Sequence, residues 1–379
     1  MRGPLDFAKL AATGVRGLQP YVPGKPIAEL QREYGVRDVL KLASNENPLG
    51  PPEESLEAIR AALCGLALYP DGACYELKRA LAAKLATAPD HITLGNGSNE
   101  VLSVIAETFL GPEDEAVYSE YGFVVYALAV QAAGATPRIA PANREQDSQP
   151  LGHSLQAFTP LINDRTRLVF IANPNNPTGT WLAPADLRGF IGSLPEHVLV
   201  VLDEAYREYL RPDSCPDTLD WLADFPNLII CRTFSKLYGL AGLRVGYAIS
   251  HPEVAELLNR VRQPFNVNAL AQVAAIAALD ATDHVRRSQD LNRSGVAQLQ
   301  AGLVRLGWSV PASAGNFVLA DTGGPAAPWN EGLLQAGIIV RPVASYGLPR
   351  HLRITVGLPE QNERLLHALG MLRERGVGV

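Results

Sequence analysis

The sequence predicts an α/β protein built around a mostly parallel sheet. Between about residues 53 and 285, short apolar runs alternate with segments of helical periodicity, and this alternation is typical of parallel α/β sheets. Most of the runs are continuously apolar, as expected of strands that are covered by helices on both faces. With 379 residues, the chain is also too long for one ordinary core, which indicates two or three domains or lobes.

The expected elements follow in order along the chain. Residues 1–35 are rich in Gly and Pro, so we expect an N-terminal arm that lies on a larger body. We expect a large domain over residues 36–284, a smaller C-terminal domain over residues 285–379, and a long helical stretch at 269–306 that links them. Other helices are expected at residues 53–63, 75–86, 100–109 and 360–375, and strands at residues 39–43, 92–94, 116–118, 168–171, 198–202, 228–231, 245–249, 316–320, 338–341 and 351–356.

The composition favours a soluble globular protein and gives no support for nucleic-acid binding. Hydrophobic residues make up 47% and charged residues 19% of the chain, and the formal net charge of −6 lacks a basic excess. No signal-peptide pattern opens the chain, and no apolar run reaches the length of a membrane span. The four cysteines form no C-x-x-C pair and the seven histidines are scattered. We therefore expect reduced thiols, no metal site and a cytoplasmic protein.

One lysine stands in a segment that suits a particular cofactor. Lys236 has apolar neighbours, and burial would lower its pKa toward the nucleophilic free amine. Ser235 adjoins it and Arg244 lies eight residues beyond, which are groups that can grip a phosphate dianion. A cofactor that needs both an amine and a phosphate cradle is pyridoxal 5'-phosphate (PLP), held as a Schiff base. The alternative is a surface lysine beside a Gly-rich turn.

A second phosphate signal lies where an expected strand meets an expected helix. Gly97 and Ser98 fall in the segment Gly-Asn-Gly-Ser-Asn-Glu, whose glycines allow a close approach and whose helix start offers free N–H groups to an anion. An N-capped helix without a ligand is the alternative. A dinucleotide fingerprint, and with it a nicotinamide-dependent dehydrogenase, is opposed by Glu100, which stands where the third glycine should be.

Three polar side chains follow expected strands and could contact a cofactor ring. The amide of Asn176, in a turn rich in Pro and Asn, could donate to a phenolic ring oxygen. Asp203 ends an apolar run, where a carboxylate faces the usual ligand crevice and could keep a pyridine nitrogen protonated. Tyr206 could bond the same ring oxygen. The alternatives are a loop without a ligand for Asn176 and a helix cap for Asp203.

Three further residues are candidates for the site only if the residues above bind PLP. Tyr121 could stack on a planar heterocycle, although core packing is the commoner role of a tyrosine. The phenol of Tyr69 could reach a phosphate from its turn. Arg353, on an expected strand, could clamp a carboxylate in a bidentate way, unless it is an ordinary surface arginine. G-x-S-x-G, Walker A, H-E-x-x-H and metal-binding Cys/His spacings are absent from the sequence.

Taken together, these residues resemble the fold-type I PLP aminotransferases, and among them the histidinol-phosphate aminotransferase family. The likeness runs from residues 20–26 to residues 353–357. It implies a large domain with a mostly parallel seven-stranded sheet flanked by helices, a smaller α+β C-terminal domain and an N-terminal arm. The matching residues occur in the family's order, namely Gly97, Ser98, Tyr121, Asn176, Asp203, Tyr206, Ser235, Lys236, Arg244 and Arg353.

The resemblance implies a role for each residue around the cofactor ring. Lys236 forms the Schiff base and moves the proton between substrate and cofactor. Asp203 pairs with the pyridinium nitrogen, Asn176 and Tyr206 bind the ring oxygen, and Tyr121 stacks on the ring.

The resemblance also implies the phosphate and substrate contacts. Around the phosphate it places Gly97, Ser98, Asn99, Ser235, Arg244 and, from the second subunit of a homodimer, Tyr69. In the family's phosphate loop an aspartate is common where Asn99 stands here. Arg353 would bind the α-carboxylate of glutamate and, in the other half-reaction, the substrate phosphate. Tyr21, Asn47 and Arg341 are further candidates for the substrate pocket.

The implied activity is transamination between histidinol phosphate and 2-oxoglutarate in histidine biosynthesis. An aromatic amino-acid transaminase of the same fold is the alternative, because both substrates offer a flat ring and an anionic group. Less favoured alternatives are a PLP lyase or decarboxylase and a catalytically silent ligand-binding domain.

Overall fold

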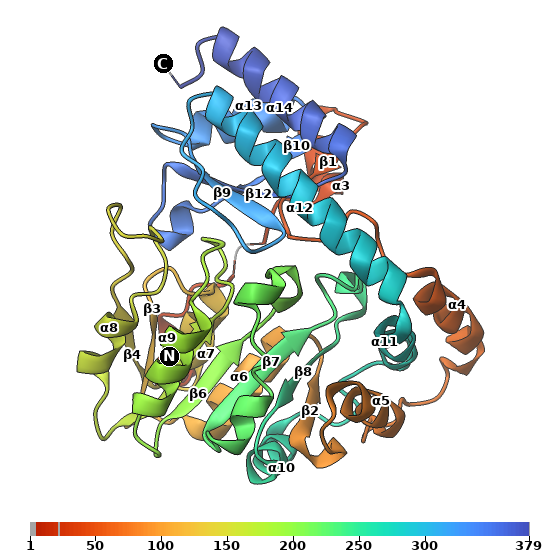
Figure 1. The fold of residues 1–379 in the computed structure, drawn as a ribbon, viewed down its shortest axis with the longest axis vertical. Coiled ribbons are helices and arrows are strands. Elements are labelled where there is room, and N and C mark those ends of the chain that lie inside the picture. Colours follow the sequence, from red (N-terminus) through yellow and green to blue (C-terminus); the bar gives the residue numbers. More distant parts are fainter. Residues whose placement is uncertain (1–4, 22, 379) are drawn as a thin grey trace.

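The computed structural model describes residues 5–21 and 23–378, which form two lobes (Figure 1). The larger lobe contains a seven-stranded sheet, and the smaller lobe, above it in Figure 1, contains a three-stranded sheet. The seven strands are β2 (Ile92–Gly95), β3 (Glu115–Ser119), β4 (Thr136–Ala140), β5 (Thr166–Ala172), β6 (Leu199–Asp203), β7 (Leu228–Thr233) and β8 (Gly246–Ile249).

The large sheet has the order β2-β8-β7-β6-β5-β3-β4. Within the described residues, β8 runs antiparallel to both of its neighbours and the other pairings are parallel. The predicted mostly parallel sheet of seven strands is therefore confirmed. The expected strands of this lobe did not include β4, because it lies at the sheet edge and several of its residues are exposed, so it lacks a continuous apolar run.

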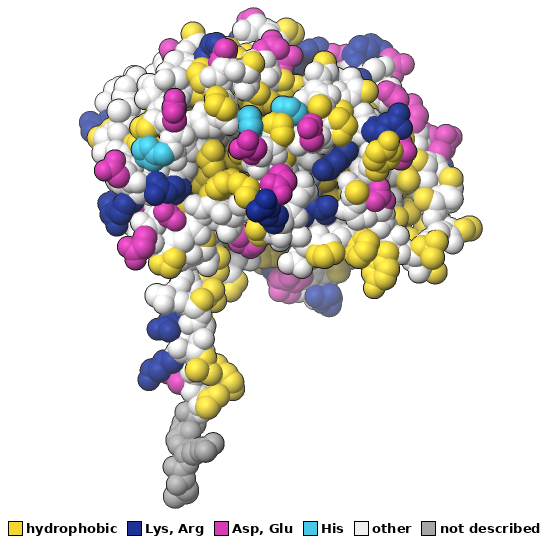
Figure 2. Space-filling view, turned by 90° about the horizontal axis from the view of Figure 1, so that it is seen from below, with side chains coloured by type: hydrophobic (Ala, Val, Ile, Leu, Met, Phe, Trp, Pro, Cys, Tyr) yellow, Lys and Arg dark blue, Asp and Glu magenta, His cyan; other side chains and the backbone are white. Residues whose placement is uncertain are grey.

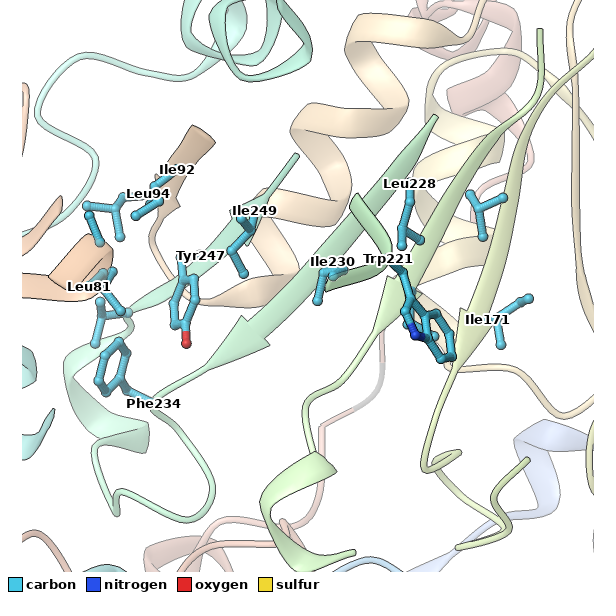
Figure 3. Packing of buried hydrophobic residues seen from close by; sticks show 14 of the residues in the cluster. Leu81, Ile92, Leu94, Ile171, Trp221, Leu228, Ile230, Phe234, Tyr247 and Ile249 are labelled. Carbon is cyan, nitrogen blue, oxygen red and sulfur yellow. The ribbon is translucent and has the colours of Figure 1, made fainter. Parts of the chain in front are cut away.

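Helices cover both faces of this sheet. Val200 and Leu202 of β6 pack with α5 (Tyr75–Leu85), α9 (Pro184–Ser193) and α11 (Ala269–Asp280), and part of that cluster is drawn in Figure 3. Val201, between them, points to the other face and packs with α6 (Ser98–Phe109), α7 (Val124–Ala132) and α10 (Pro252–Val261). Burial on both faces explains the continuous apolar runs. Two shorter or more peripheral helices complete this lobe, α4 (Glu53–Ala62), which packs on α11, and α8 (Leu155–Phe158).

The expected single helical stretch at 269–306 is in fact two helices. Ala281 leaves the helical conformation with a ψ of 57°, so that α11 ends and α12 (Thr282–Arg305) begins in a new direction. As Figure 1 shows, α12 then runs from the larger lobe to the smaller one, where it packs against α14 (Pro359–Glu374). The linking role that the sequence suggested therefore belongs to α12.

The smaller lobe joins segments from both ends of the chain. Its sheet has the order β11-β12-β9, formed by β11 (Arg341–Pro342), β12 (His351–Thr355) and β9 (Phe317–Asp321), and α12, α13 (Ala327–Gln335) and α14 pack around it. β1 (Leu40–Lys41) pairs in parallel with β10 (Ile338–Ile339) beside this lobe. The strand that leads into the larger lobe is thus anchored on the smaller one. The domain boundaries at residues 36 and 285 stay a prediction.

The N-terminal segment projects from the larger lobe (Figure 2). It contains α1 (Phe7–Leu10) and α2 (Thr13–Arg16), and α2 contacts α7. α3 (Ile27–Tyr34) follows and packs through Leu30 on the smaller lobe. None of the helices in the described residues is long and apolar enough to cross a membrane.

Candidate active site

A cavity lies between the lobes, at the carboxyl ends of the central strands. Ala172, Asp203 and Thr233, the last residues of β5, β6 and β7, line it on one side, and Arg341 and Arg353 of the smaller lobe line it on the other. This is the edge at which parallel α/β sheets bind their ligands. Of the residues expected at the site, the cavity lining includes Tyr21, Ser98, Asn99, Asn176, Asp203, Tyr206, Ser235, Lys236, Arg244, Arg341 and Arg353.

Lys236 lies in the turn that follows β7, and its amine is held in the cavity by one backbone contact. Nζ donates to the carbonyl oxygen of Ser44 at 3.1 Å. Burial, together with the nearby cations Arg353 and Arg244, lowers the pKa of Lys236 to about 7. A substantial fraction of this lysine is therefore a neutral, nucleophilic amine at neutral pH.

Asp203 is a buried carboxylate without a cationic partner among the described residues. It is 5% exposed, Oδ2 accepts a hydrogen bond from the Tyr126 hydroxyl at 2.8 Å, and Oδ1 accepts one from the backbone N–H of Ala205 at 3.2 Å. Burial raises the pKa of Asp203 to about 6, against the opposing effect of those two donors. A carboxylate in this state is well placed to pair with a cationic ligand group.

Tyr206 and Asn176 line the same cavity as Asp203, and each already accepts a hydrogen bond from another residue of the protein. Asn45 Nδ2 donates to the hydroxyl oxygen of Tyr206 at 2.9 Å, and Arg353 Nη1 donates to Asn176 Oδ1 at 2.6 Å. Burial raises the pKa of Tyr206 to about 12, so the phenol is protonated at neutral pH. The hydroxyl hydrogen of Tyr206 and the amide hydrogens of Asn176 are thus left to donate into the cavity.

An anion cradle forms one end of the cavity, where α6 begins. Gly97 has a φ of 85°, which an L-residue rarely adopts, and a Cβ there would overlap the Arg244 guanidinium. Ser98, next in the chain, is the first residue of α6, whose free N–H groups favour an anion. Arg244 Nη1 lies 3.3 Å from Ser235 Oγ, to which it donates. The residue types and the close approach fit a phosphate group.

The opposite end of the cavity carries two arginines. Arg353 is buried, donates to the carbonyl of Ala43 at 2.6 Å and has its guanidinium 5.5 Å from the ring centre of Phe317. Its Nε is buried and has no partner in the described part of the chain. Arg341 lies over the ring of Tyr21 at 5.6 Å. This end therefore suits a carboxylate or a phosphate.

Four expected site residues are outside the lining of this cavity, namely Gly97, which borders it at Arg244, and Tyr121, Asn47 and Tyr69. Tyr121 packs against a cluster that includes Leu319 and Val343, and Phe123, two residues further on, lines the cavity. The stacking role expected of Tyr121 stays a prediction, with Phe123 as a second aromatic residue at the cavity.

Asn47 and Tyr69 face elsewhere. Asn47 Nδ2 donates to the carbonyl of Leu237 at 2.7 Å and to Ser288 Oγ at 2.9 Å, so Asn47 supports the turn that carries Lys236, and its place in the substrate pocket stays a prediction. Tyr69 is 83% exposed and stacks on Phe265 with ring centres 4.8 Å apart. Its expected role in the cavity of a second subunit stays a prediction.

Four residues of the site were missed in the sequence. Phe123 and Tyr346 line the cavity, Asn45 holds Tyr206, and Tyr126 holds Asp203. Tyr126, in α7, lies edge-on to Phe123 with ring centres 5.9 Å apart, and neither ring was singled out in the sequence. Asn45 was seen only as part of a turn.

The chain matches known aminotransferases along almost its whole length. The family model for aminotransferases of class I and II matches residues 37–369. Histidinol-phosphate aminotransferase 2 of Methylococcus capsulatus is 53% identical over 365 residues, which cover 96% of this chain and 98% of that protein. The enzyme of the same name from Pseudomonas aeruginosa is 54% identical over 367 residues, with 96% and 98% covered.

Solved structures agree with the fold. The crystal structure of histidinol-phosphate aminotransferase from Sinorhizobium meliloti in complex with pyridoxal-5'-phosphate superimposes with a TM-score of 0.87 at 30% identity, covering 96% of this chain and 98% of the other. The predicted fold-type I architecture is confirmed. The chain belongs to the aminotransferases of class I and II and, within them, to the histidinol-phosphate aminotransferase family.

Proposed function

We propose that this protein uses PLP to transfer an amino group between histidinol phosphate and 2-oxoglutarate, in histidine biosynthesis. The observation that carries the proposal is one cavity that combines the Lys236 amine, the Asp203 carboxylate and the anion cradle at Gly97 and Arg244. When bound, PLP withdraws electrons from the substrate carbon and makes its proton acidic. The residues of this chain bind the reactants, orient them and move that proton.

The polar residues of the cavity fit the ring of PLP. Asp203 pairs with the pyridine nitrogen, whose positive charge supplies the partner that this buried carboxylate lacks. Asn176 and Tyr206 donate to the ring oxygen, since their other polar atoms are engaged by Arg353 and Asn45. Tyr121 is the first candidate for the ring that stacks on the cofactor, and Phe123, which lines the cavity, is the second.

The phosphate of PLP fits the anion cradle. The backbone at Gly97 and Ser98 offers N–H donors at the start of α6, with Asn99 beside them. Arg244 and Ser235 add a positive charge and a hydroxyl. A phosphate held in this way would keep the ring near Asp203 and Lys236.

Lys236 is the residue that attaches the cofactor and moves the substrate proton. Its pKa of about 7, lowered by burial, leaves a neutral amine available as a nucleophile and as a general base at neutral pH. With PLP and substrate bound, the Lys236 amine would accept the proton from the substrate Cα and deliver it to the cofactor within the same half-reaction.

The arginines at the other end of the cavity hold the anionic group of the substrate. Arg353 offers its unpartnered Nε to the α-carboxylate of glutamate in one half-reaction and to the phosphate of histidinol phosphate in the other. Arg341 and Tyr21 lie at the same end and bind the same group.

A homodimer in the cytoplasm completes the proposal. Exposed large hydrophobic residues gather around the turn that carries Tyr69, and an apolar surface of this kind is typical of an interface. They are Leu63, Leu66, Leu68, Tyr75 and Phe265. Pairing of two copies over this surface would cover it and bring Tyr69 to the phosphate end of the partner's cavity.

The proposal is tested by comparing two amino donors with 2-oxoglutarate as acceptor. We expect kcat/KM for histidinol phosphate to exceed that for phenylalanine by about 10- to 100-fold, because a phosphate dianion forms stronger charge-assisted bonds with the arginines. The reverse order would favour the aromatic amino-acid alternative. Absence of glutamate formation with either donor would contradict the proposal.

A further inference from the structure

Asn45 connects the two lobes to one hydroxyl group in the cavity. It is 1% exposed and has a φ of 56°, in the left-handed region that Asn tolerates better than most residues. Its backbone N–H donates to Thr355 Oγ1 at 2.9 Å, and that hydroxyl donates to Asn45 Oδ1 at 3.1 Å. Asn316 Nδ2 donates to the Asn45 carbonyl at 2.9 Å. Two residues of the smaller lobe thus hold both the backbone and the side chain of Asn45.

This arrangement determines which way the hydrogen bond to Tyr206 points. Because Oδ1 of Asn45 accepts from Thr355, the amide group remains to donate, and it lies 2.9 Å from the Tyr206 hydroxyl oxygen. Tyr206 therefore accepts from Asn45 and keeps its own hydrogen for a different partner. The phenol ring is held edge-on by Phe317 at 5.3 Å, which limits where that hydrogen can go.

We propose that Asn45 is a positioning residue that makes Tyr206 a hydrogen-bond donor to the ring oxygen of PLP, and that Thr355 and Asn316 hold Asn45 in this role from the smaller lobe. The inference rests on the proposed function, because it needs PLP in the cavity. It goes beyond that function in assigning a role to Asn45 and in naming the contact through which the smaller lobe affects the cofactor.

The consequence is electrostatic. A donor at the ring oxygen stabilises the anionic form of that oxygen and so lowers the pKa of the nitrogen that joins Lys236 to the cofactor. The charged and titratable groups that face Tyr206 are Asp203, Lys236, Arg353 and Tyr346. A change at Asn45 leaves the identity of these residues unaltered, and the effect of an added charge is measured with a separate variant.

The test is a pH titration of the visible absorbance of the cofactor-loaded protein. Asn45→Asp keeps the size, the tolerance of positive φ and the acceptor for Thr355, but it replaces the donor by an acceptor. Tyr206 would then donate to residue 45 in place of the ring oxygen. We expect the titration midpoint to rise by roughly one pH unit, as expected from the loss of one hydrogen bond to a charged group.

The direct effect of the added negative charge is separated with Tyr206→Phe. That variant alone should raise the midpoint by a similar amount, and the double variant should titrate within about 0.3 pH unit of Tyr206→Phe. A shift by Asn45→Asp that persists in the Tyr206→Phe background would overturn the proposal, because the charge would then act without Tyr206.

Two further variants serve as controls for the Asn→Asp change itself and for the added charge. Asn259→Asp makes the same substitution in α10, where the amide oxygen accepts from Arg262 Nε, and it should leave the midpoint within about 0.3 pH unit of the wild type. Asn45→Gly permits the positive φ and removes the side chain without adding charge, and it should raise the midpoint by a smaller amount than Asn45→Asp. An unchanged midpoint in both Asn45 variants would refute the inference. A wild-type protein that takes up no PLP would instead refute the proposed function.

Discussion

The two sides of the carboxyl end of β6 carry neighbouring acids with opposite surroundings. Glu204, 3% exposed, accepts hydrogen bonds from Arg232 Nε at 2.8 Å and from Thr218 Oγ1 at 2.7 Å, and Arg207 lies beside it. Asp203, 5% exposed, has the hydroxyl of Tyr126 and a backbone N–H, but no cation among the described residues. One acid is satisfied by the protein, and the other is left for a ligand.

This difference separates residues that hold the fold from residues that serve the reaction. A buried carboxylate paired with a guanidinium is expensive to break, because removal of one partner leaves a buried charge. A buried carboxylate without a cation costs stability in the free protein and recovers it when a cationic ligand arrives. Substitutions at the cavity, where Asp203 lies, should therefore mainly lower the rate of catalysis. Substitutions around Glu204 should mainly lower the free energy of unfolding.

The largest effect is expected from Lys236→Ala on the cavity side. Loss of the attachment point and of the general base should lower kcat on the order of 10⁴-fold, while the free energy of unfolding changes little. Steady-state rates with histidinol phosphate measure this. Lys84→Ala, which removes an exposed lysine of α5, is the control and should leave kcat unchanged. Comparable losses in the two variants would show that the Lys236 amine has no special role.

At the Glu204 pair, Arg232→Met should destabilise the protein without altering which amino donor the protein prefers. Removing this guanidinium leaves Glu204 with a weakened set of partners, so the free energy of unfolding should fall by about 3–5 kcal/mol. Urea unfolding at neutral pH measures the loss. The double variant with Glu204→Gln should recover part of it, because the buried charge is gone. A stable Arg232→Met protein with an altered preference among amino donors would show that Arg232 serves the reaction and not the fold.

The stability of the cofactor-free protein should depend on pH through Asp203. Burial raises the pKa of Asp203 from 3.8 to about 6 in the folded state, so ionisation opposes folding. The contribution is fully favourable below pH 3.8 and is lost as the pH rises through about 6, to a total on the order of 3 kcal/mol.

Asp203→Asn cannot ionise, so the difference in unfolding free energy between wild type and variant should develop across this interval. Saturation with PLP should diminish the difference, because the pyridinium nitrogen then pairs with Asp203. A difference that is the same at every pH would show that Asp203 is not the group responsible.

The smallest expected effect is on the affinity for PLP, and it distinguishes the two aromatic residues that flank Gly122. Tyr121→Leu removes the first candidate for the stacking ring and should weaken PLP binding about fivefold, whereas Phe123→Leu should weaken it less than about twofold. Equilibrium titration of the cofactor-free protein with PLP gives both constants. A larger loss for Phe123→Leu would assign the stacking role to that residue.

The sequence was sufficient for those parts of the molecule that local pattern determines. Asp203 and Lys236 follow continuous apolar strands, and Gly97 sits between a strand and a helix, so their common edge follows from the fold class alone. The sheet edge at β4 was missed because its exposed residues break the apolar run.

Other features depend on contacts that no local pattern specifies. Tyr121 and Phe123 are both aromatic, and the sequence does not distinguish the one that lines the cavity in the structure, Phe123. Asn45 lies 310 residues from Thr355, its main partner in the smaller lobe. The different surroundings of Asp203 and Glu204 depend on Arg232, which comes from the neighbouring strand.

The most direct measurement is chemical trapping of the cofactor on the lysine. The protein is incubated with PLP, reduced with borohydride, digested, and the modified peptide is identified by mass spectrometry. We expect a single stable modification on Lys236, with Asp203→Asn reducing its yield and Lys236→Ala abolishing it. Modification spread over exposed lysines, or its persistence in Lys236→Ala, would contradict the assignment of this cavity as the cofactor site.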